Sequence, residues 1–325
     1  MKFSVLINNY NYGRYLCECV ESALSQSYPA HEIIVVDDGS TDDSLHILNK
    51  YFENNHRVTV IPQANQGQMA AIARGIETAT GDIICLLDSD DRYKTDYLAT
   101  LKMHYSEFPR TDLAFCRFET FGEKTSLNNE SIWLQPQKDY DYGYTALLTY
   151  FGNVRWLGNY TSTISLRIRL ARTLNLHEVA RAFYIPTSAD FSVLLGASLL
   201  GGRKYYLHRA LIDYRIHEVN HYKRRRSTVD GQYMFNFYDL VRYQYFKRLS
   251  CISEEMFRWL DAEAQTIPDP DPKHLEYYRK IQSSKASPKK ISWTRKLERK
   301  LRSVRKKVFG LKIATPSRST PSNWT

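Results

Sequence analysis

The sequence has little cysteine and no long apolar run. Five cysteines in 325 residues are an odd number without the regular spacing of a disulfide framework, so we expect a reducing compartment. No stretch reaches the roughly 18 uninterrupted apolar residues that a membrane-spanning helix needs, and the N-terminal apolar run is too short for a secretory signal. These absences predict a protein that is made and kept in the cytosol.

The chain also lacks the glycine-rich motifs of two large nucleotide-binding classes. No Gly-x-Gly-x-x-Gly follows the first apolar segment, which argues against a nicotinamide enzyme. The glycine-containing segment 196–204 lacks the Gly-Lys-Ser/Thr order of a phosphate-binding P-loop. Cys17 and Cys19 have no second pair or histidine cluster that would complete a zinc site.

Positive charge is concentrated near one end of the chain. Residues 285–312 hold 12 basic side chains and one acid, so this stretch carries a charge of +11, whereas the whole chain carries a net charge of +10. The rest of the chain is therefore close to neutral. A nucleic-acid-binding protein would show its basic excess in the folded part, so we expect no nucleic-acid partner.

Short β-rich segments alternate with helical patterns over the first 118 residues. The segments are 3–7, 32–37, 58–61, 82–88 and 113–118. Each is a continuous apolar run, which is typical of parallel strands buried on both faces and joined by crossover helices. The pattern predicts an α/β fold whose ligand site lies beyond the carboxyl ends of the strands.

The remainder predicts a mixed second half and a separate tail. Residues 119–160 indicate a long, partly irregular connection that covers a cleft, and then follow a strand at 161–168, a helix at 189–200, an extended segment at 204–217 and helices at 229–264 and 273–283. We expect a catalytic domain over 1–222, in which residues 1–118 bind the nucleotide and residues 119–222 bind the acceptor. A helical extension over 223–283 and a partly disordered basic tail over 284–325 are expected to follow.

Two acidic segments follow predicted strands. In residues 35–44 (VVDDGSTDDS) two acids emerge from a buried strand, where a carboxylate can accept hydrogen bonds from a nucleobase or a ribose hydroxyl. In residues 86–92 (LLDSDDR) Asp88 and Asp90 straddle Ser89, so a turn can aim both at one hard cation such as Mg²⁺ or Mn²⁺. A plain capped turn is the simpler alternative for each segment. Together the segments predict a nucleoside-diphosphate site.

Six motifs follow one another between residues 3 and 222: SVLINNYN (4–11), VESALSQSY (20–28), IIVVDDGSTDDS (33–44), NQGQMAAIARGI (65–76), GDIICLLDSDD (81–91) and DYRIHEVN (213–220). In this order and at these intervals they resemble the family 2 inverting glycosyltransferases. The resemblance implies a GT-A fold, a Rossmann-like mixed and mainly parallel sheet flanked by helices. It also implies transfer of a sugar from a nucleotide-diphosphate donor to a hydroxyl acceptor with inversion.

The resemblance assigns donor contacts at the matching positions. The nucleotide-binding loop falls on Asn8, Asn9 and Tyr10. Asp38 falls on the nucleobase contact. The chain departs from the family where Pro-Thr is frequent, at Asn8 and Asn9, and where Arg-Asn is frequent, at Ile72 and Ala73. These departures concern the detailed donor contacts and not the reaction class.

The resemblance also assigns the reacting groups. Asp88 and Asp90 match the Asp-x-Asp pair, with Asp90 on a divalent metal ion, Mn²⁺ or Mg²⁺, and Asp88 nearer the ribose. The base that takes the acceptor proton falls on Asp190, which otherwise serves only to cap its helix. His217 approaches the diphosphate or the metal, or is structural, and Arg215 pairs either with phosphate or with a core acid.

The basic tail has an amphipathic helical pattern. Apolar residues recur at spacings of four and three from Trp293 to Leu311, with Arg and Lys between them. An anionic membrane surface satisfies both faces of such a helix, so we expect residues 289–312 to hold the protein on the inner face of the cytoplasmic membrane. A solvated tail, a helix docked on the body and a nucleic-acid contact stay open as alternatives.

We therefore predict a glycosyltransferase of surface polysaccharide or glycolipid assembly. Its donor is a nucleotide-sugar, a UDP-sugar in the first place, and its acceptor is a glycan or a lipid-linked glycan. One alternative is a sugar-phosphate nucleotidyltransferase, which usually has a Gly-rich loop with Arg and Lys where this chain reads NNYNYG (8–13). The other is an inactive nucleotide- or glycan-binding module, against which the three acids Asp88, Asp90 and Asp190 argue.

Overall fold

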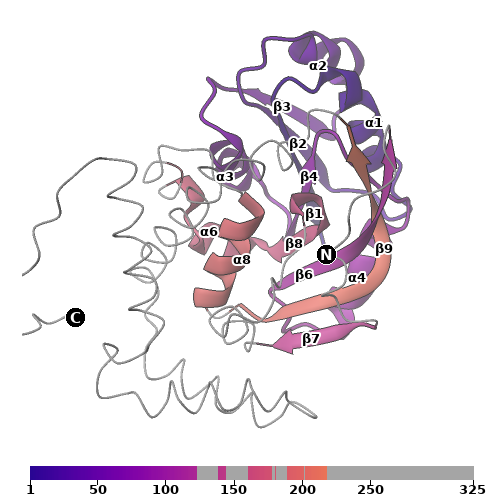
Figure 1. Ribbon diagram of the computed structural model, residues 1–325, viewed down its shortest axis with the longest axis vertical. Coiled ribbons are helices and arrows are strands. Elements are labelled where there is room, and N and C mark those ends of the chain that lie inside the picture. The colour runs from indigo at the N-terminus through magenta and orange to yellow at the C-terminus, as the bar shows by residue number, and fades with distance from the viewer. Residues whose placement is uncertain (123–137, 144–159, 178–179, 181–188, 201, 218–325) are drawn as a thin grey trace, which may run out of the picture.

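A computed structural model describes residues 1–122, 138–143, 160–177, 180, 189–200 and 202–217 (Figure 1). Within these residues a nine-stranded sheet has the order β3-β2-β1-β4-β8-β6-β9-β5, and β7 pairs with β9. Helices cover both faces of this sheet. The mixed, mainly parallel α/β fold that the sequence predicts is confirmed.

The N-terminal region of the sheet is parallel. Its strands are β1 (Phe3–Asn9), β2 (Glu32–Asp37), β3 (Val58–Pro62) and β4 (Ile83–Asp88). The connections contain α1 (Gly13–Leu24), α2 (Ser44–Phe52) and α3 (Gln68–Thr78). Parallel pairing requires such crossovers, because the chain must return to the same end of the sheet before the next strand begins.

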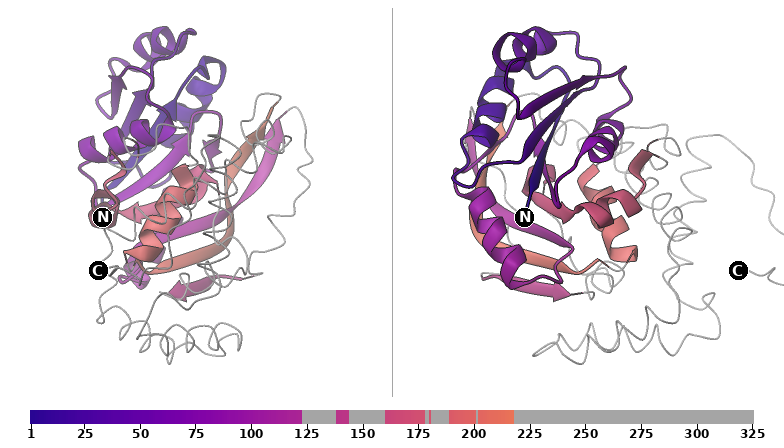
Figure 2. Two further views of the ribbon diagram at one scale, coloured as in Figure 1. Left: turned by 60° about the vertical axis from the view of Figure 1, so that its left-hand side comes forward. Right: turned by 180° about the vertical axis from the view of Figure 1, so that it is seen from behind.

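The second region of the sheet mixes directions. Its strands are β5 (Arg92–Tyr93), β6 (Leu113–Gly122), β7 (Tyr140–Gly143), β8 (Ile164–Arg167) and β9 (Lys204–Ile216). Strand β8 lies antiparallel between β4 and β6. Strands β6 and β9 run parallel, side by side, as a long curved pair (Figure 2).

The strand predicted over 161–168 is shorter in the structure. Thr161–Thr163 forms a 3-10 turn, β8 covers only Ile164–Arg167, and α6 (Ile168–Thr173) follows at once. The hydroxyl of Thr163 donates to the carbonyl of Tyr160 at 2.7 Å. Such local bonds from Ser and Thr side chains to the backbone compete with strand formation, which explains the late start of the strand.

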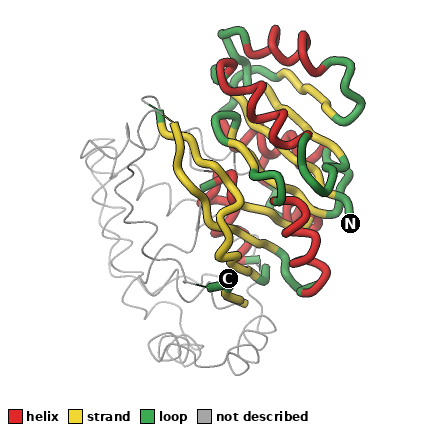
Figure 3. The backbone as a smooth tube through the Cα atoms, turned by 90° about the vertical axis from the view of Figure 1, so that its right-hand side faces the viewer, coloured by secondary structure: helices red, strands yellow, loops and turns green. Residues whose placement is uncertain are grey.

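The two faces of the sheet carry separate hydrophobic cores. Leu6 packs with α3, α6 and α8 (Ala189–Leu199), whereas its neighbours Val5 and Ile7 pack with α1, α2 and α4 (Tyr97–Glu107). Figure 3 shows the strands between helices on either side. Burial on both faces is the reason why β1, β2 and β4 are continuous apolar runs in the sequence.

Strand register brings the polar strand ends together. Asn8 of β1 is aligned with Asp88 of β4, and Asn9 is aligned with Asp37 of β2. Because these strands are parallel, their carboxyl ends lie at one edge of the sheet. The predicted nucleotide-binding residues therefore gather at that edge.

Several predictions concern residues outside the described ranges. These are the helices at 229–264 and 273–283, the domain boundary at 222, the extension 223–283, the tail 284–325 and its membrane segment 289–312. Of the connection at 119–160, the structure describes 119–122, 138–143 and 160. Among the residues that the structure describes, no helix is both long and apolar enough to cross a membrane.

Candidate active site

Three carboxylates meet where β4 ends. The oxygens of Asp88, Asp90 and Asp91 lie within 4.8 Å of one another. The amide of Asp91 donates to the carbonyl of Asp88 at 3.0 Å and closes the turn. We call residues 88–91 the acidic turn. The sequence identified Asp88 and Asp90 but gave no role to Asp91.

Asp88 is held by three other segments. Asn8 Nδ2 and Gln68 Nε2 both donate to its Oδ1, at 3.0 and 2.8 Å, and its amide donates to the hydroxyl of Ser162 at 3.0 Å. Burial raises the pKa of Asp88 to about 7, and the negative charge of Asp90 adds to the rise. Asp88 thus lies in a partly buried position, held by hydrogen bonds, where a nearby cation would favour its charged form.

Asp91 is buried beneath the turn, with 1% of its surface exposed. The hydroxyl of Ser162 donates to its Oδ2 at 2.5 Å, and the amide of Arg215 donates to its Oδ1 at 2.8 Å. Burial, together with the charges of Asp90 and Asp88, raises the pKa of Asp91 well above its ordinary value. Its hydrogen bonds tie the acidic turn to the 3-10 turn before β8 and to β9.

Asp90 is in contact with His217, which the resemblance placed near the diphosphate or the metal, a role that stays a prediction. His217 Nε2 lies 2.9 Å from Asp90 Oδ2, and the histidine side chain is fully buried. The rings of Tyr12 and Tyr15 pack against the imidazole at centroid distances of 5.5 and 5.3 Å. The residue that follows β9 therefore brings an imidazole to the acidic turn.

This donor set fits a divalent cation. Clustered carboxylates with a neighbouring imidazole suit Mn²⁺ or Mg²⁺. A cation would offset the burial and the mutual repulsion that raise the pKa values of Asp88 and Asp91. Among the described residues, the buried Asn8 Oδ1 and Ser89 Oγ have no hydrogen-bond partner. Unsatisfied buried acceptors at a ligand site are typical where a ligand or its water completes the bonding.

The other predicted loop residues divide into two kinds. Asn9 is 2% exposed, and its Nδ2 donates to Asp37 Oδ1 at 2.7 Å and to Ser40 Oγ at 3.1 Å. Asn9 thus ties the end of β1 to the turn after β2. Tyr10, in contrast, is 42% exposed at the same edge.

Asp38 orders the loop before α3. Its Oδ1 accepts from Gln63 Nε2 at 2.7 Å and from the Gln66 amide at 2.9 Å, and its Oδ2 accepts from the Gly67 amide at 2.7 Å. Gly67 has φ of 88°, a left-handed conformation that favours glycine. A carboxylate offers about four acceptor positions, so the nucleobase assignment of Asp38 stays a prediction that relies on the remaining one.

Asp190 lies in the first turn of α8. Its negative charge is one of the contributions that raise the pKa of Asp88, which places its carboxylate within electrostatic reach of the acidic turn. The helix predicted over 189–200 is confirmed as α8. The role of Asp190 as the base stays a prediction.

The family model described as glycosyl transferase family 2 matches residues 4–166, which include both acidic segments. The chain belongs to this family. An uncharacterized glycosyltransferase of Nostoc sp. (strain PCC 7120) is 30% identical over 71% of this chain and 70% of its own length. The chondroitin synthase of Escherichia coli is 39% identical over 36% of this chain, but the match covers only 17% of that enzyme.

The fold of this glycosyltransferase is shared with solved structures. Staphylococcus aureus TarS, residues 1–349, crystallised with UDP-GlcNAc, superimposes with a TM-score of 0.56 over 87% of this chain and 91% of its own. The sequence identity is 20%, so the likeness concerns the fold. The GT-A architecture expected from the sequence is confirmed. Membership in glycosyl transferase family 2 excludes the nucleotidyltransferase alternative.

Proposed function

We propose that this glycosyltransferase transfers a sugar from a UDP-sugar to a hydroxyl of a glycan or lipid-linked acceptor, with inversion, in polysaccharide or glycolipid assembly. The observation that carries the proposal is the acidic turn with His217 beside it, at the carboxyl edge of the parallel strands. The UDP-GlcNAc bound to TarS supports the donor class, and the chondroitin synthase relative supports a polysaccharide product.

Asp90 would hold a divalent ion, with Asp88, Asp91 and His217 around it. Such an ion supplies charge that stabilises the departing diphosphate. Hydrogen bonds from Asn8 and Gln68 to Asp88, and from Ser162 to Asp91, hold these carboxylates in place. These bonds oppose the electrostatic repulsion that would otherwise move the carboxylates apart.

The nucleoside would lie along the ends of β1 and β2. Asn8 Oδ1 is a buried acceptor that a ribose hydroxyl would satisfy. Tyr10 offers an exposed ring for a nucleobase. Asp38, only 2% exposed, orders the loop 63–67 and would reach the nucleobase through its one remaining acceptor position. Asn9 is buried and holds the ends of β1 and β2 together through its hydrogen bond to Asp37.

Asp190 would act as the base. Inversion requires a group that accepts the proton of the acceptor hydroxyl as its oxygen attacks the anomeric carbon, opposite the leaving diphosphate. A carboxylate at the start of α8, close enough to Asp88 to influence its pKa, suits that position. The base and the cation site then come from different halves of the chain and face one sugar.

The test is release of UDP from a panel of UDP-sugars in the presence of Mn²⁺ and a glycan acceptor. We predict that Asp190→Asn lowers turnover by about 10²-fold or more, because the amide cannot accept the proton, while UDP affinity is kept. Asp43→Asn is the matched control, an exposed acid outside the site. Unchanged turnover in Asp190→Asn would place the base elsewhere, and an inactive wild type that binds UDP would support a binding module.

A further inference from the structure

Arg215 of β9 is a largely buried arginine close to the acidic turn. Its side chain is 13% exposed, and its guanidinium carbon lies 4.4 Å from the ring centroid of Tyr15 and 4.2 Å from that of Phe121. Contact with two aromatic rings restricts the rotamers of an otherwise flexible side chain. The arginine is therefore anchored before any ligand binds.

Arg215 contacts the acidic turn at two points. Its Nε donates to the carbonyl of Asp90 at 2.7 Å, and its amide donates to Asp91 Oδ1 at 2.8 Å. Two residues further on, His217 contacts the carboxylate of the same Asp90. Alternate residues of an extended chain point to one side, so the last residues of β9 and the residue after it fix both the backbone and the side chain of Asp90.

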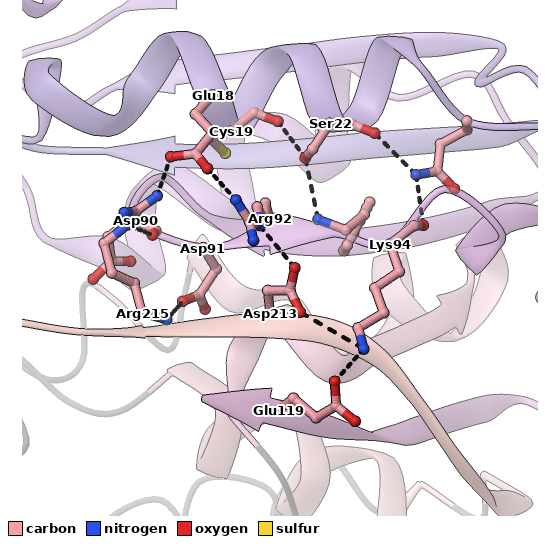
Figure 4. Close-up of polar contacts among 12 residues, drawn as sticks. Glu18, Cys19, Ser22, Asp90, Asp91, Arg92, Lys94, Glu119, Asp213 and Arg215 are labelled. Carbon is pink, nitrogen blue, oxygen red and sulfur yellow. Dashed lines mark hydrogen bonds and ion pairs between the residues drawn. The ribbon is translucent and has the colours of Figure 1, made fainter. Parts of the chain in front are cut away.

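The remaining contacts of Arg215 lead away from the site. Its Nη2 pairs with Glu18 of α1, and Glu18 also pairs with Nη1 of Arg92, which follows the acidic turn. Arg92 Nε in turn donates to Asp213 Oδ2 at 2.7 Å. Figure 4 shows Glu18 reaching from α1 toward both arginines, with β9 on the other side.

These contacts decide between the two roles that the sequence left open. The guanidinium already uses Nε for a carbonyl and Nη2 for a carboxylate, and little of it is exposed to a ligand. A phosphate that approached Nη2 would compete with the Glu18 carboxylate for this group. The geometry favours the pairing with a protein acid.

We propose that Arg215 is a positioning residue that sets the orientation of Asp90 for cation binding, and that Glu18 fixes Arg215 in turn. The inference rests on the proposed cation site. A lysine cannot reproduce it, because one ammonium group cannot donate to the Asp90 carbonyl and to Glu18 with the spacing of the planar guanidinium. The site thus depends on a helix, α1, that contributes no carboxylate to it.

The chain offers a matched control next to the same strand. Arg203 immediately precedes the other end of β9, its side chain is 16% exposed, and it pairs with Asp141. It therefore resembles Arg215 in burial and in having an acidic partner, and Asp141 and Asp112, which it contacts, lie outside the acidic turn. Loss of either arginine should cost stability, whereas loss of Arg215 alone should affect the cation.

The experiment is titration of Mn²⁺ alone into the wild type, Arg215→Lys, Glu18→Gln and Arg203→Lys, with the thermal unfolding midpoint of each. We expect Arg215→Lys to weaken Mn²⁺ binding by about 10-fold or more, as outer partners of metal ligands typically do. Glu18→Gln should weaken it in the same direction. Arg203→Lys should leave Mn²⁺ affinity unchanged, and excess Mn²⁺ should restore turnover in Arg215→Lys.

Wild-type Mn²⁺ affinity in Arg215→Lys, with a lowered unfolding midpoint, would show a merely structural arginine and overturn the inference alone. Absence of Mn²⁺ binding in the wild type would instead overturn the cation site of the proposed function. If Arg215→Lys does not fold, Glu18→Gln decides, because Glu18 touches neither Asp90 nor Asp91 in any described contact.

Discussion

At the scale of single residues, Lys204 is a buried lysine that has no role in the proposed chemistry. It begins β9, is 1% exposed, and its Nζ has no hydrogen-bond partner among the described residues. Burial lowers its pKa to about 7, although the charge of Asp112 acts in the opposite direction. A lysine in this position costs the folded state free energy, because the charge must be removed or left without a partner.

We predict that Lys204→Met raises the free energy of unfolding, by an amount on the order of 3 kcal/mol at neutral pH. The folded pKa lies below the unfolded one, so between about pH 7 and pH 10 the unfolded chain binds more protons and wild-type stability rises with pH. The advantage of the methionine should therefore shrink over the same range. Urea unfolding of both proteins at several pH values measures this, and equal stability at every pH would contradict it.

The acidic site could be predicted only partly from its residues. The spacing of Asp88 and Asp90 after a buried strand was enough to indicate a cation site. Gln68 and Asp91 were missed because their roles depend on partners distant in sequence, such as Ser162 and Arg215. A local pattern shows which side chains leave a strand together, but not which other segments meet them.

At the scale of elements, the packing of α3 on β1 depends on one glycine. A Cβ added at Gly75 would overlap the side chain of Leu6, which is fully buried in the core beneath the helix. Close packing leaves that leucine little room to move. The helix can lie this near to the strand that carries Asn8 only because Gly75 has no side chain.

We predict that Gly75→Ala lowers the free energy of unfolding by about 1–3 kcal/mol, the usual cost of overpacking. At an exposed helix position alanine is more favourable than glycine by about 1 kcal/mol. A stabilised Gly75→Ala variant would therefore show that α3 packs on β1 more loosely than described. Combining Gly75→Ala with Leu6→Ala tests the cause. The two effects should be less than additive, since the second change removes the side chain with which the first collides.

Elements with strong apolar patterns were predicted well. The strands β1 to β4 agree with the sequence to within a residue or two, because burial on both faces leaves a continuous apolar run. Strands β5 and β7 were not predicted. They are two and four residues long and are held by pairing with the distant β9, which no local pattern reveals.

At the scale of the whole molecule, the charge of the chain is divided between two regions. Residues 285–312 of the basic tail carry +11, and the rest of the chain is nearly neutral. No family motif was found beyond residue 220, and the family model ends at residue 166. The tail, which lies outside the described residues, is thus expected to be separable from catalysis.

We predict that a chain cut after Ser283 folds, binds UDP and loses binding to vesicles that contain anionic lipid. Binding of the full chain should also fall as salt rises, because screening weakens the attraction of Lys and Arg to the surface. Vesicle sedimentation measures both effects, with neutral vesicles as the control. An unfolded truncated protein would identify the tail as a structural helix, and a full chain that ignores vesicles would refute the membrane contact.

The assignment of the acidic turn is tested most directly by calorimetric titration of UDP into the wild type and Asp90→Asn, each with Mn²⁺ and with a chelator. We predict that Mn²⁺ strengthens UDP binding to the wild type by about 10-fold or more and has almost no effect on Asp90→Asn, whose unfolding midpoint stays near that of the wild type without metal. Tight, Mn²⁺-dependent UDP binding by Asp90→Asn would contradict the assignment.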